Sequence, residues 1–126
     1  MGVTYDAGAL IAGERSERRF WARHRALLVA RQVPIAPAPV VAQVWRGGAR
    51  QANLGRLLTG CLVEALSSDQ ARAVGNLLGR AGRTDIADAT VVEGALRRHD
   101  MVITSDPDDL LALAGAAGSH LAVEPP

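Results

Sequence analysis

The sequence predicts an α/β fold, with a central, mainly parallel sheet of four to five short strands and helices on both faces. Short apolar runs typical of buried strands alternate along the chain with longer segments of helical periodicity. The segments between strands are long enough to cross the sheet as helices, which is the connection that parallel neighbours require. No linker, repeat or low-complexity tract divides the 126 residues, of which 48% are hydrophobic. We therefore expect one domain over residues 1–126.

The expected elements follow one another closely. Strand composition occurs at residues 2–5, 33–36, 61–66, 101–104 and 119–123. Helical periodicity occurs at residues 6–14, 17–31, 39–48, 50–60, 67–82, 84–99 and 106–118. Ser16 is the expected N-cap of the second helix, a serine caps the helix that starts near residue 67, and Thr84 caps the next one. Pro37 and Pro39 close the second strand, and Gly47 with Gly48 ends the helix after it.

The composition excludes several classes of protein. Every one of the 14 basic residues is an arginine, so a P-loop, which needs a lysine, and Schiff-base chemistry are excluded. The single cysteine, Cys61, has apolar neighbours; it is expected in the core and fits a reducing cytosol, so we expect a cytoplasmic protein. Three scattered histidines and one cysteine do not indicate zinc or a nucleophilic triad. No apolar run of about 18 residues predicts a membrane span, and no secretory signal is expected.

The charges are unevenly distributed along the chain. Residues 1–60 hold nine arginines and three acidic residues, whereas residues 61–126 hold five arginines and ten acidic residues. The first segment therefore carries +6 and the second −5, within a net charge of +1. Such a split favours a surface that binds a polyanion beside an acidic pocket, although solvated surface charge is the common alternative.

Two aspartates follow expected strands. Asp6 comes directly after the first strand, and Asp106 comes just after the strand at residues 101–104. Ligands of parallel sheets collect at the carboxyl ends of strands. If these two strands are neighbours, the two carboxylates face each other, which is unfavourable without a proton or a cation between them. Asp106 also has a purely structural interpretation as the N-cap of the last helix, with Asp109 completing a capping box.

Two further aspartates start the helix at residues 84–99. Asp85 and Asp88 are three positions apart, so they share one face of its first turns. Asp85 is readily explained by the helix dipole. Asp88 stands among apolar residues in "DIADATVV", and a functional role is favoured for it.

These motifs and their order resemble the PIN-domain ribonucleases, and most closely the VapC toxins of bacterial toxin–antitoxin pairs. The resemblance covers nearly the whole chain and is carried by "TYDAGALIA", "VVAQVWRGG" and "DIADATVVEGALRRHDMVITSDPDDL". Asp88 precedes Asp106 by 18 positions, as in that family. The resemblance implies a PIN domain in which Asp6, Asp88 and Asp106 are catalytic residues and ligands of Mg²⁺ or Mn²⁺, with Asp85 as a further ligand.

One position departs from the family pattern. Gln43 stands in "VAQVWRGG", in the helix after the second strand, where such proteins usually carry a glutamate. Glutamine keeps a carbonyl oxygen but lacks the charge, so the ion is expected to bind more weakly, with Asp85 compensating. The alternative for Gln43 is a plain surface residue. Asp108 is an accessory candidate near the pocket, with a helix-start acid as its structural alternative.

The resemblance implies a Mg²⁺-dependent endoribonuclease, a VapB-type antitoxin as partner, and a homodimer. Arg46 and Arg50 are the arginines expected to hold the RNA backbone, where contacts give affinity and sensitivity to salt. Phe20 in "RRFWARHR" is expected in the core or in the groove of a partner more than in base stacking. Two alternatives remain open: a weakened PIN domain that binds RNA or antitoxin without efficient cleavage, supported by Gln43, and an α/β phosphatase, which the absence of lysine disfavours.

Overall fold

The computed structural model describes residues 1–126 and confirms the α/β fold. Its five strands form one sheet in which every pairing is parallel, in the order β3-β2-β1-β4-β5. The strands are β1 (Val3–Tyr5), β2 (Ile35–Pro37), β3 (Leu62–Glu64), β4 (Met101–Ile103) and β5 (Val123–Glu124). β1 therefore lies at the centre, and its neighbour β4 comes from the other end of the chain.

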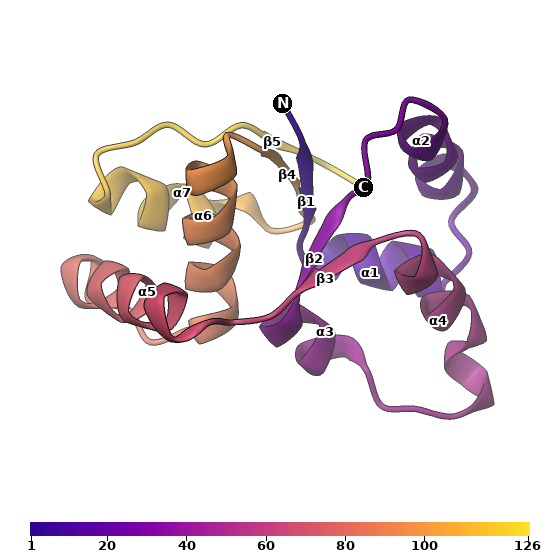
Figure 1. The fold of residues 1–126 in the computed structure, drawn as a ribbon, viewed down its shortest axis with the longest axis horizontal. Helices are drawn as coiled ribbons and strands as arrows, with labels where there is room; N and C mark the ends of the chain where they lie inside the picture. The colour runs from indigo at the N-terminus through magenta and orange to yellow at the C-terminus, as the bar shows by residue number, and fades with distance from the viewer.

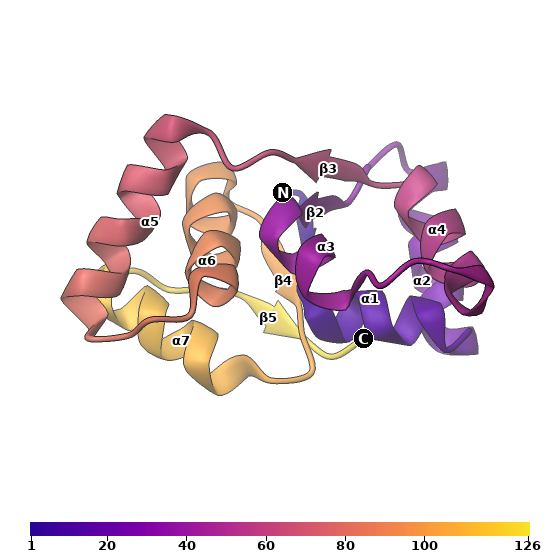
Figure 2. The same ribbon diagram turned by 90° about the horizontal axis from the view of Figure 1, so that it is seen from below.

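Seven α-helices and one 3₁₀ turn cover the sheet. They are α1 (Ala7–Glu14), α2 (Arg18–Val29), α3 (Ala38–Val44), η1 (Ala49–Gln51), α4 (Ala52–Thr59), α5 (Ser68–Ala81), α6 (Ile86–Arg98) and α7 (Pro107–Ala116). α5, α6 and α7 pack together on one side, and α1, α2 and α4 lie on the other, as Figures 1 and 2 show. α3 packs on both α1 and α6 and so joins the two groups. No helix combines the length and the apolar character needed to cross a membrane.

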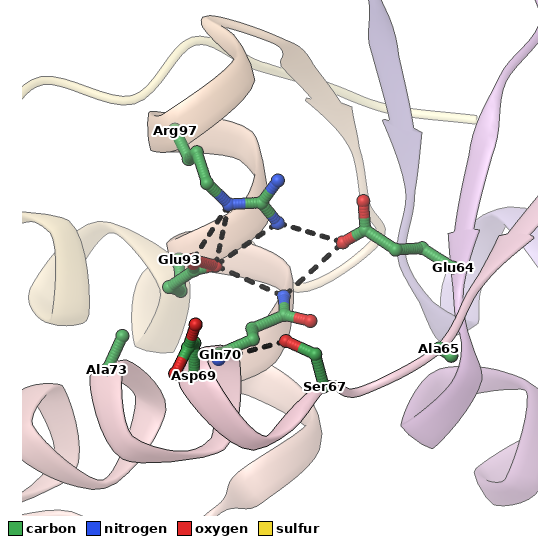
Figure 3. Close-up of a pocket in the computed structure, with 8 residues that line it drawn as sticks. All are labelled: Glu64, Ala65, Ser67, Asp69, Gln70, Ala73, Glu93 and Arg97. Atoms are coloured by element: carbon green, nitrogen blue, oxygen red, sulfur yellow. Dashed lines mark hydrogen bonds and ion pairs between the residues drawn. The ribbon is translucent and has the colours of Figure 1, made fainter.

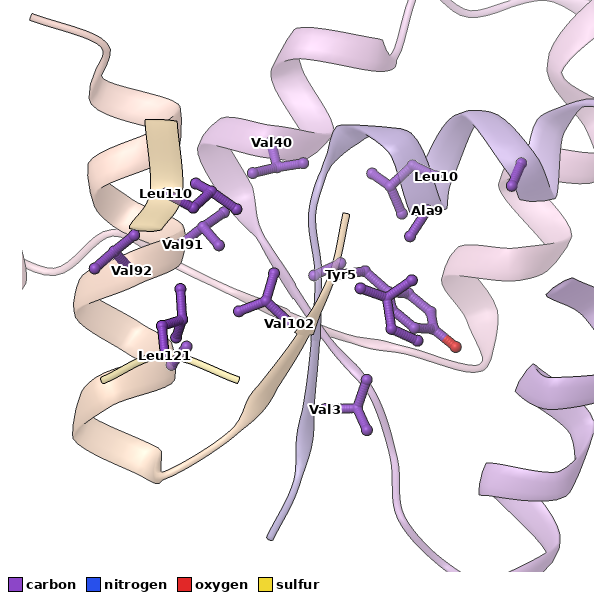
Figure 4. Close-up of a cluster of buried hydrophobic side chains, with 14 of the residues drawn as sticks. Val3, Tyr5, Ala9, Leu10, Val40, Val91, Val92, Val102, Leu110 and Leu121 are labelled. Atoms are coloured by element: carbon purple, nitrogen blue, oxygen red, sulfur yellow. The ribbon is translucent and has the colours of Figure 1, made fainter. Parts of the chain in front are cut away.

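The core lies between the sheet and both helix groups. Tyr5, Leu10, Val40, Val91 and Leu110 have no exposed surface, and Figure 4 shows them gathered around the central strands. Phe20 is 1% exposed, which confirms its expected place in the core and excludes it from base stacking. Cys61 packs against the core as expected, and burial raises the pKa of its thiol to about 12.

Several expected boundaries are wrong, because caps depend on backbone conformation as well as residue type. Ser16 is not an N-cap: its φ of 57° places it in a left-handed turn, and α2 starts after Glu17. Thr84 does not cap α6, because Asp85 takes that position. The second strand lies at Ile35–Pro37 instead of residues 33–36, and the last strand begins only at Val123. Ser67 does cap α5, accepting a hydrogen bond from the Gln70 amide at 3.1 Å.

Candidate active site

The carboxyl edge of the central strands carries the acidic residues singled out by the sequence. Asp6 follows β1 and precedes α1, and its amide donates to the Ile103 carbonyl of β4 at 3.0 Å. Asp106 precedes α7, three residues after the end of β4. Because β1 and β4 pair in register, Tyr5 opposite Ile103, the two aspartates emerge at the same edge of the sheet.

A buried threonine connects these two aspartates. Thr104, 3% exposed, donates its hydroxyl proton to Asp6 Oδ2 at 2.8 Å, and its own Oγ1 accepts a hydrogen bond from the Asp106 amide at 3.1 Å. One side chain thus fixes a carboxylate oxygen of Asp6 and the backbone at Asp106. The sequence did not single out Thr104; its only signal is a polar residue at the end of a buried apolar strand.

The structural explanation for Asp106 holds only in part. Asp106 does occupy the N-cap position of α7, but its side chain makes no capping hydrogen bond. The capping box is also absent, because the Asp109 carboxylate pairs with Arg83 at 2.7 Å. The exposed Asp106 carboxylate is therefore left without a protein partner at the edge of the sheet.

Asp85 and Asp88 come to this edge on the first turn of α6, a helix that packs against β1, β2 and α7. Asp85 is the N-cap, and its Oδ1 accepts a hydrogen bond from the Asp88 amide at 2.9 Å. The role of Asp85 as a helix N-cap thus accounts for one of its two carboxylate oxygens. The Asp88 side chain is partly buried and has no hydrogen-bond donor from the protein.

The pKa values of Asp6 and Asp88 reflect repulsion between these carboxylates. Burial, and then the charges of Asp85, Asp6, Asp109 and Asp106, raise the pKa of Asp88 to about 6. Burial also raises the pKa of Asp6, against the hydrogen bond from Thr104, and the charges of Asp85 and Asp106 add to the rise. Asp85 and Asp106 therefore act on both of the other aspartates, and the four share one electrostatic environment.

No arginine neutralises the acidic cleft, a name used here for Asp6, Asp85, Asp88 and Asp106. None of the six salt bridges of the chain involves any of these four residues. Asp108, on the first turn of α7, is exposed beside the cleft. An uncompensated group of this kind is stabilised either by protons or by a bound cation.

The chemistry of the donors fits a hydrated magnesium ion better than a closed metal centre. No three His, Cys, Asp or Glu side chains are placed closely enough to hold an ion directly. Mg²⁺, however, retains several waters and takes only one or two carboxylates directly, together with phosphate oxygens of the substrate. Oxygen donors alone, without thiolate or imidazole, are the set that such an ion prefers.

Gln43 lies on α3, and the two arginines expected to hold RNA lie in the segment that follows this helix. Gln43 is exposed on α3, whose packing on α1 and α6 places it between two of the helices that carry the aspartates. Arg46 Nη1 donates to the carbonyls of Ala42 and Trp45, at 3.2 and 2.7 Å, and so caps the end of α3. Arg50, in η1, is exposed and forms no salt bridge.

A cavity of about 530 Å³ lies elsewhere, between β3, α5 and α6. Figure 3 shows that its polar side chains are bound to one another: Arg97 pairs with Glu93 and Glu64, and Gln70 donates to both of these glutamates. Because Glu64, Gln70, Glu93 and Arg97 satisfy one another, they hold β3, α5 and α6 together, and the exposed Asp69 is the one charged lining residue without a partner.

Comparison with known proteins bears on the fold. No family model and no curated protein matches the sequence significantly. Among solved structures, the chain is similar to one in the crystal structure of VapBC2 from Rickettsia felis, a complex bound to a DNA fragment from its promoter. The TM-score is 0.76 and the sequence identity 12%, and the similarity covers 99% of this chain and 98% of that chain.

Two further structures are similar over 98% of this chain. PAE2754 from Pyrobaculum aerophilum has a TM-score of 0.67 and 18% identity, with 83% of its chain covered. FitAB bound to an IR36 DNA fragment has a TM-score of 0.64 and 15% identity, with 94% covered. Together with the five-stranded parallel sheet, these similarities show that the chain has a PIN-like fold, as its sequence motifs predicted.

Proposed function

We propose that this protein is a metal-dependent endoribonuclease and the toxin component of a VapBC-type toxin–antitoxin pair. The observation that carries the proposal is the acidic cleft: four aspartates lie at one edge of the sheet without an arginine partner, and burial together with the neighbouring carboxylates raises the pKa of Asp88 to about 6. Carboxylates kept together in this way, at the ligand-binding edge of a parallel sheet, favour a divalent cation as their counter-charge.

Asp6, Asp88 and Asp106 would hold Mg²⁺, or Mn²⁺ in its place, directly or through water, with Asp85 as a further ligand. When bound, such an ion supplies a water of lowered pKa and charge for the phosphate oxygens. The chain's own contribution is orientation. Thr104 fixes one oxygen of Asp6 at 2.8 Å, and the Asp85 cap fixes the first turn of α6 and hence Asp88.

The partner and the substrate are part of the same proposal. Two of the similar structures are those of VapBC2 and FitAB, both bound to DNA; by analogy of fold we propose a VapB-type antitoxin for this chain, and a homodimer as its own assembly. The substrate we propose is RNA. Arg50 has no acidic partner and lies in the connection that leaves α3, so its charge is available to the phosphate backbone.

RNA cleavage by the purified protein tests the proposal. Cleavage is expected with Mg²⁺ or Mn²⁺, to stop with EDTA, and to be lost in Asp6→Asn, which keeps the shape of the side chain and removes its charge. Asp69→Asn, the same change on α5 outside the cleft, is the matched control and should cleave normally. Expression without the antitoxin should slow growth, and Asp6→Asn should relieve this. Full toxicity of Asp6→Asn at equal protein level would contradict the catalytic reading.

A second candidate function is binding without efficient cleavage. Two observations favour it: Gln43 replaces the usual glutamate, and no three acids are placed to hold an ion directly. The cleavage assay with and without EDTA separates the two candidates. A binding module would yield no metal-dependent cleavage products, and it would bind RNA or antitoxin equally well in the presence and absence of EDTA.

A further inference from the structure

The connection from α3 to α4 presents an exposed tryptophan. Trp45, the first residue after α3, is 43% exposed, and its indole N–H has no acceptor in the protein. The other tryptophan differs in every respect: Trp21 is 8% exposed, donates to the Gly13 carbonyl at 3.0 Å, and lies beneath the Arg56 guanidinium at 4.9 Å. The structure therefore uses Trp21 to pack and leaves much of the Trp45 ring in solvent.

The segment that carries Trp45 is held firmly although it is a loop. Gln51, 8% exposed, accepts hydrogen bonds from the amides of Arg46 and Gly47, at 2.7 and 2.9 Å. Its amide nitrogen donates to the Val44 carbonyl at 2.9 Å and to Glu14 at 2.6 Å. These four bonds fix both sides of Trp45, so ordering this loop costs little when a ligand binds.

The Trp45 ring is partly open to solvent, and two exposed arginines lie in the same loop. A Cβ on Gly55 of α4 would stand 3.9 Å from one edge of the indole, so the ring rests against α4 where a glycine leaves room. Arg46 precedes the turn at Gly47 and Gly48, where φ is 82° and 92°, and Arg50 follows it. Both arginines are exposed, and neither forms a salt bridge.

The loop also lies within reach of the acidic cleft. α3 packs against α1 and α6, and the Gln51–Glu14 bond ties the far end of the loop to the last residue of α1. Asp6 precedes the first residue of α1, and a helix of eight residues is about 12 Å long. A strand of RNA that passes from the cleft along α1 therefore meets Trp45 and Arg50 within a few nucleotides.

We propose that Trp45 is a base-stacking residue that, together with Arg50, positions single-stranded RNA beside the acidic cleft. This rests on the proposed function and assigns the residue that holds the bases of the substrate. An indole with cations beside it binds unpaired bases of any sequence through their faces, while arginine holds the backbone. In a duplex the faces are already stacked, so Trp45 selects unpaired RNA.

Fluorescence anisotropy of a labelled single-stranded oligoribonucleotide tests this, with EDTA present to prevent cleavage. Trp45→Ala is expected to weaken binding by about tenfold, and Trp45→Phe to keep most of the affinity because a ring remains. Val29→Ala, which removes another exposed apolar side chain (86% exposed) at the end of α2, is the matched control and should bind normally. Thermal unfolding should show that all three variants are folded.

Two further measurements distinguish stacking from charge. The slope of log affinity against log salt should be unchanged in Trp45→Ala and should fall by about 0.7 in Arg50→Ala. An oligomer with abasic positions should bind wild type and Trp45→Ala equally. Equal binding of the normal oligomer by both proteins would overturn the inference and leave Trp45 as a surface for a protein partner.

The outcome for Trp45 is independent of the outcome for cleavage. Metal-dependent cleavage with unchanged RNA binding in Trp45→Ala would overturn the stacking role and leave the proposed function standing. Weakened binding in Trp45→Ala without any metal-dependent cleavage would support the stacking role and contradict the nuclease. A wild-type protein that binds no single-stranded RNA would contradict both.

Discussion

The aspartates of the cleft differ in what their surroundings do for them. Asp6 is 7% exposed but has a hydrogen bond from Thr104, so its charge is partly compensated within the protein. Asp88 has no such donor, and burial together with four other aspartates raises its pKa to about 6. The charge of Asp88 therefore destabilises the fold more than the charge of Asp6 does. Such a loss of stability is common at functional sites.

Asp88→Asn should therefore stabilise the protein in EDTA at pH 7 to 8. A pKa raised from 3.8 to about 6 corresponds to about 3 kcal/mol at full strength. Screening at this partly exposed position reduces the expected gain in the free energy of unfolding to about 1 kcal/mol. The native state binds the extra proton, so the wild type should lose stability as pH rises from about 4 through about 6. Urea unfolding at several pH values measures both effects.

The control for Asp88→Asn is Asp109→Asn. The Asp109 carboxylate pairs with Arg83 at 2.7 Å, so its removal takes away an attraction along with a repulsion and should not stabilise. If Asp88→Asn is no more stable than the wild type at pH 8, the cleft carboxylates do not repel one another as the pKa of Asp88 indicates. Asp88→Asn is also expected to lose cleavage, because it removes a proposed ligand.

At the scale of elements, one arginine of α6 joins the helix to the sheet. Arg98 donates to Asp100, which precedes β4, at 2.9 Å, to Glu64 of β3 at 2.7 Å and to Thr4 of β1 at 2.9 Å. Thr4 also donates to Asp100 at 2.8 Å. The side chain of Asp100 is only 4% exposed, so its charge depends on these partners. The network ties the end of α6 to β1, to β3 and to the start of β4.

Arg98→Met should lower the free energy of unfolding by about 3 kcal/mol, because it leaves the buried Asp100 charge without its cation. Arg97→Met is the matched control: its side chain is 48% exposed, so losing its pairs with Glu64 and Glu93 should cost less than about 1 kcal/mol. Adding Asp100→Asn to Arg98→Met should recover part of the loss. If urea unfolding shows equal destabilisation by Arg98→Met and Arg97→Met, the interactions of Arg98 contribute no more to stability than those of an exposed ion pair.

The elements themselves were largely predictable, and their ends were not. Hydrophobic periodicity indicated every strand and helix, because each must bury one face. The cap at Thr84 was wrong because a second capping residue, Asp85, stands beside it. The cap at Ser16 was wrong because the chain turns there through a left-handed conformation, which residue type alone does not reveal. Thr104 and Gln51 were missed because their hydrogen bonds reach partners distant in the sequence, 98 and 37 positions away.

At the scale of the whole molecule, the positively and negatively charged halves of the sequence lie on different sides of the sheet. The helices of residues 1–60 lie on one side of the sheet and those of residues 61–126 on the other, apart from α3, which touches both groups (Figure 1). The positive segment and the negative segment thus meet at the cleft, where α1 and α6 begin. An RNA held by arginines on one side can place a phosphate against the aspartates of the other, provided that a cation screens them.

Binding of that cation should be visible in the stability of the whole chain. An ion that binds only the native state raises its stability by RT ln(1 + [Mg²⁺]/Kd), so the melting temperature should rise with Mg²⁺ concentration. Gln43→Glu adds a carboxylate to α3, between the helices that carry Asp6 and Asp88. It should lower the melting temperature slightly in EDTA, through repulsion, and should shift the Mg²⁺ titration to lower concentration. The curves of melting temperature against Mg²⁺ concentration for wild type and Gln43→Glu should therefore cross.

Asp85→Asn should shift the same titration to higher concentration if Asp85 supplies the charge that Gln43 lacks. The two changes should then be non-additive in a double-mutant cycle, because both act on one ion. Superimposable titrations of wild type and Gln43→Glu would place Gln43 outside the reach of the ion and make it a surface residue. Tighter Mg²⁺ binding with loss of cleavage would instead mean that the site works with one neutral ligand, because a further carboxylate holds the ion without activating the water.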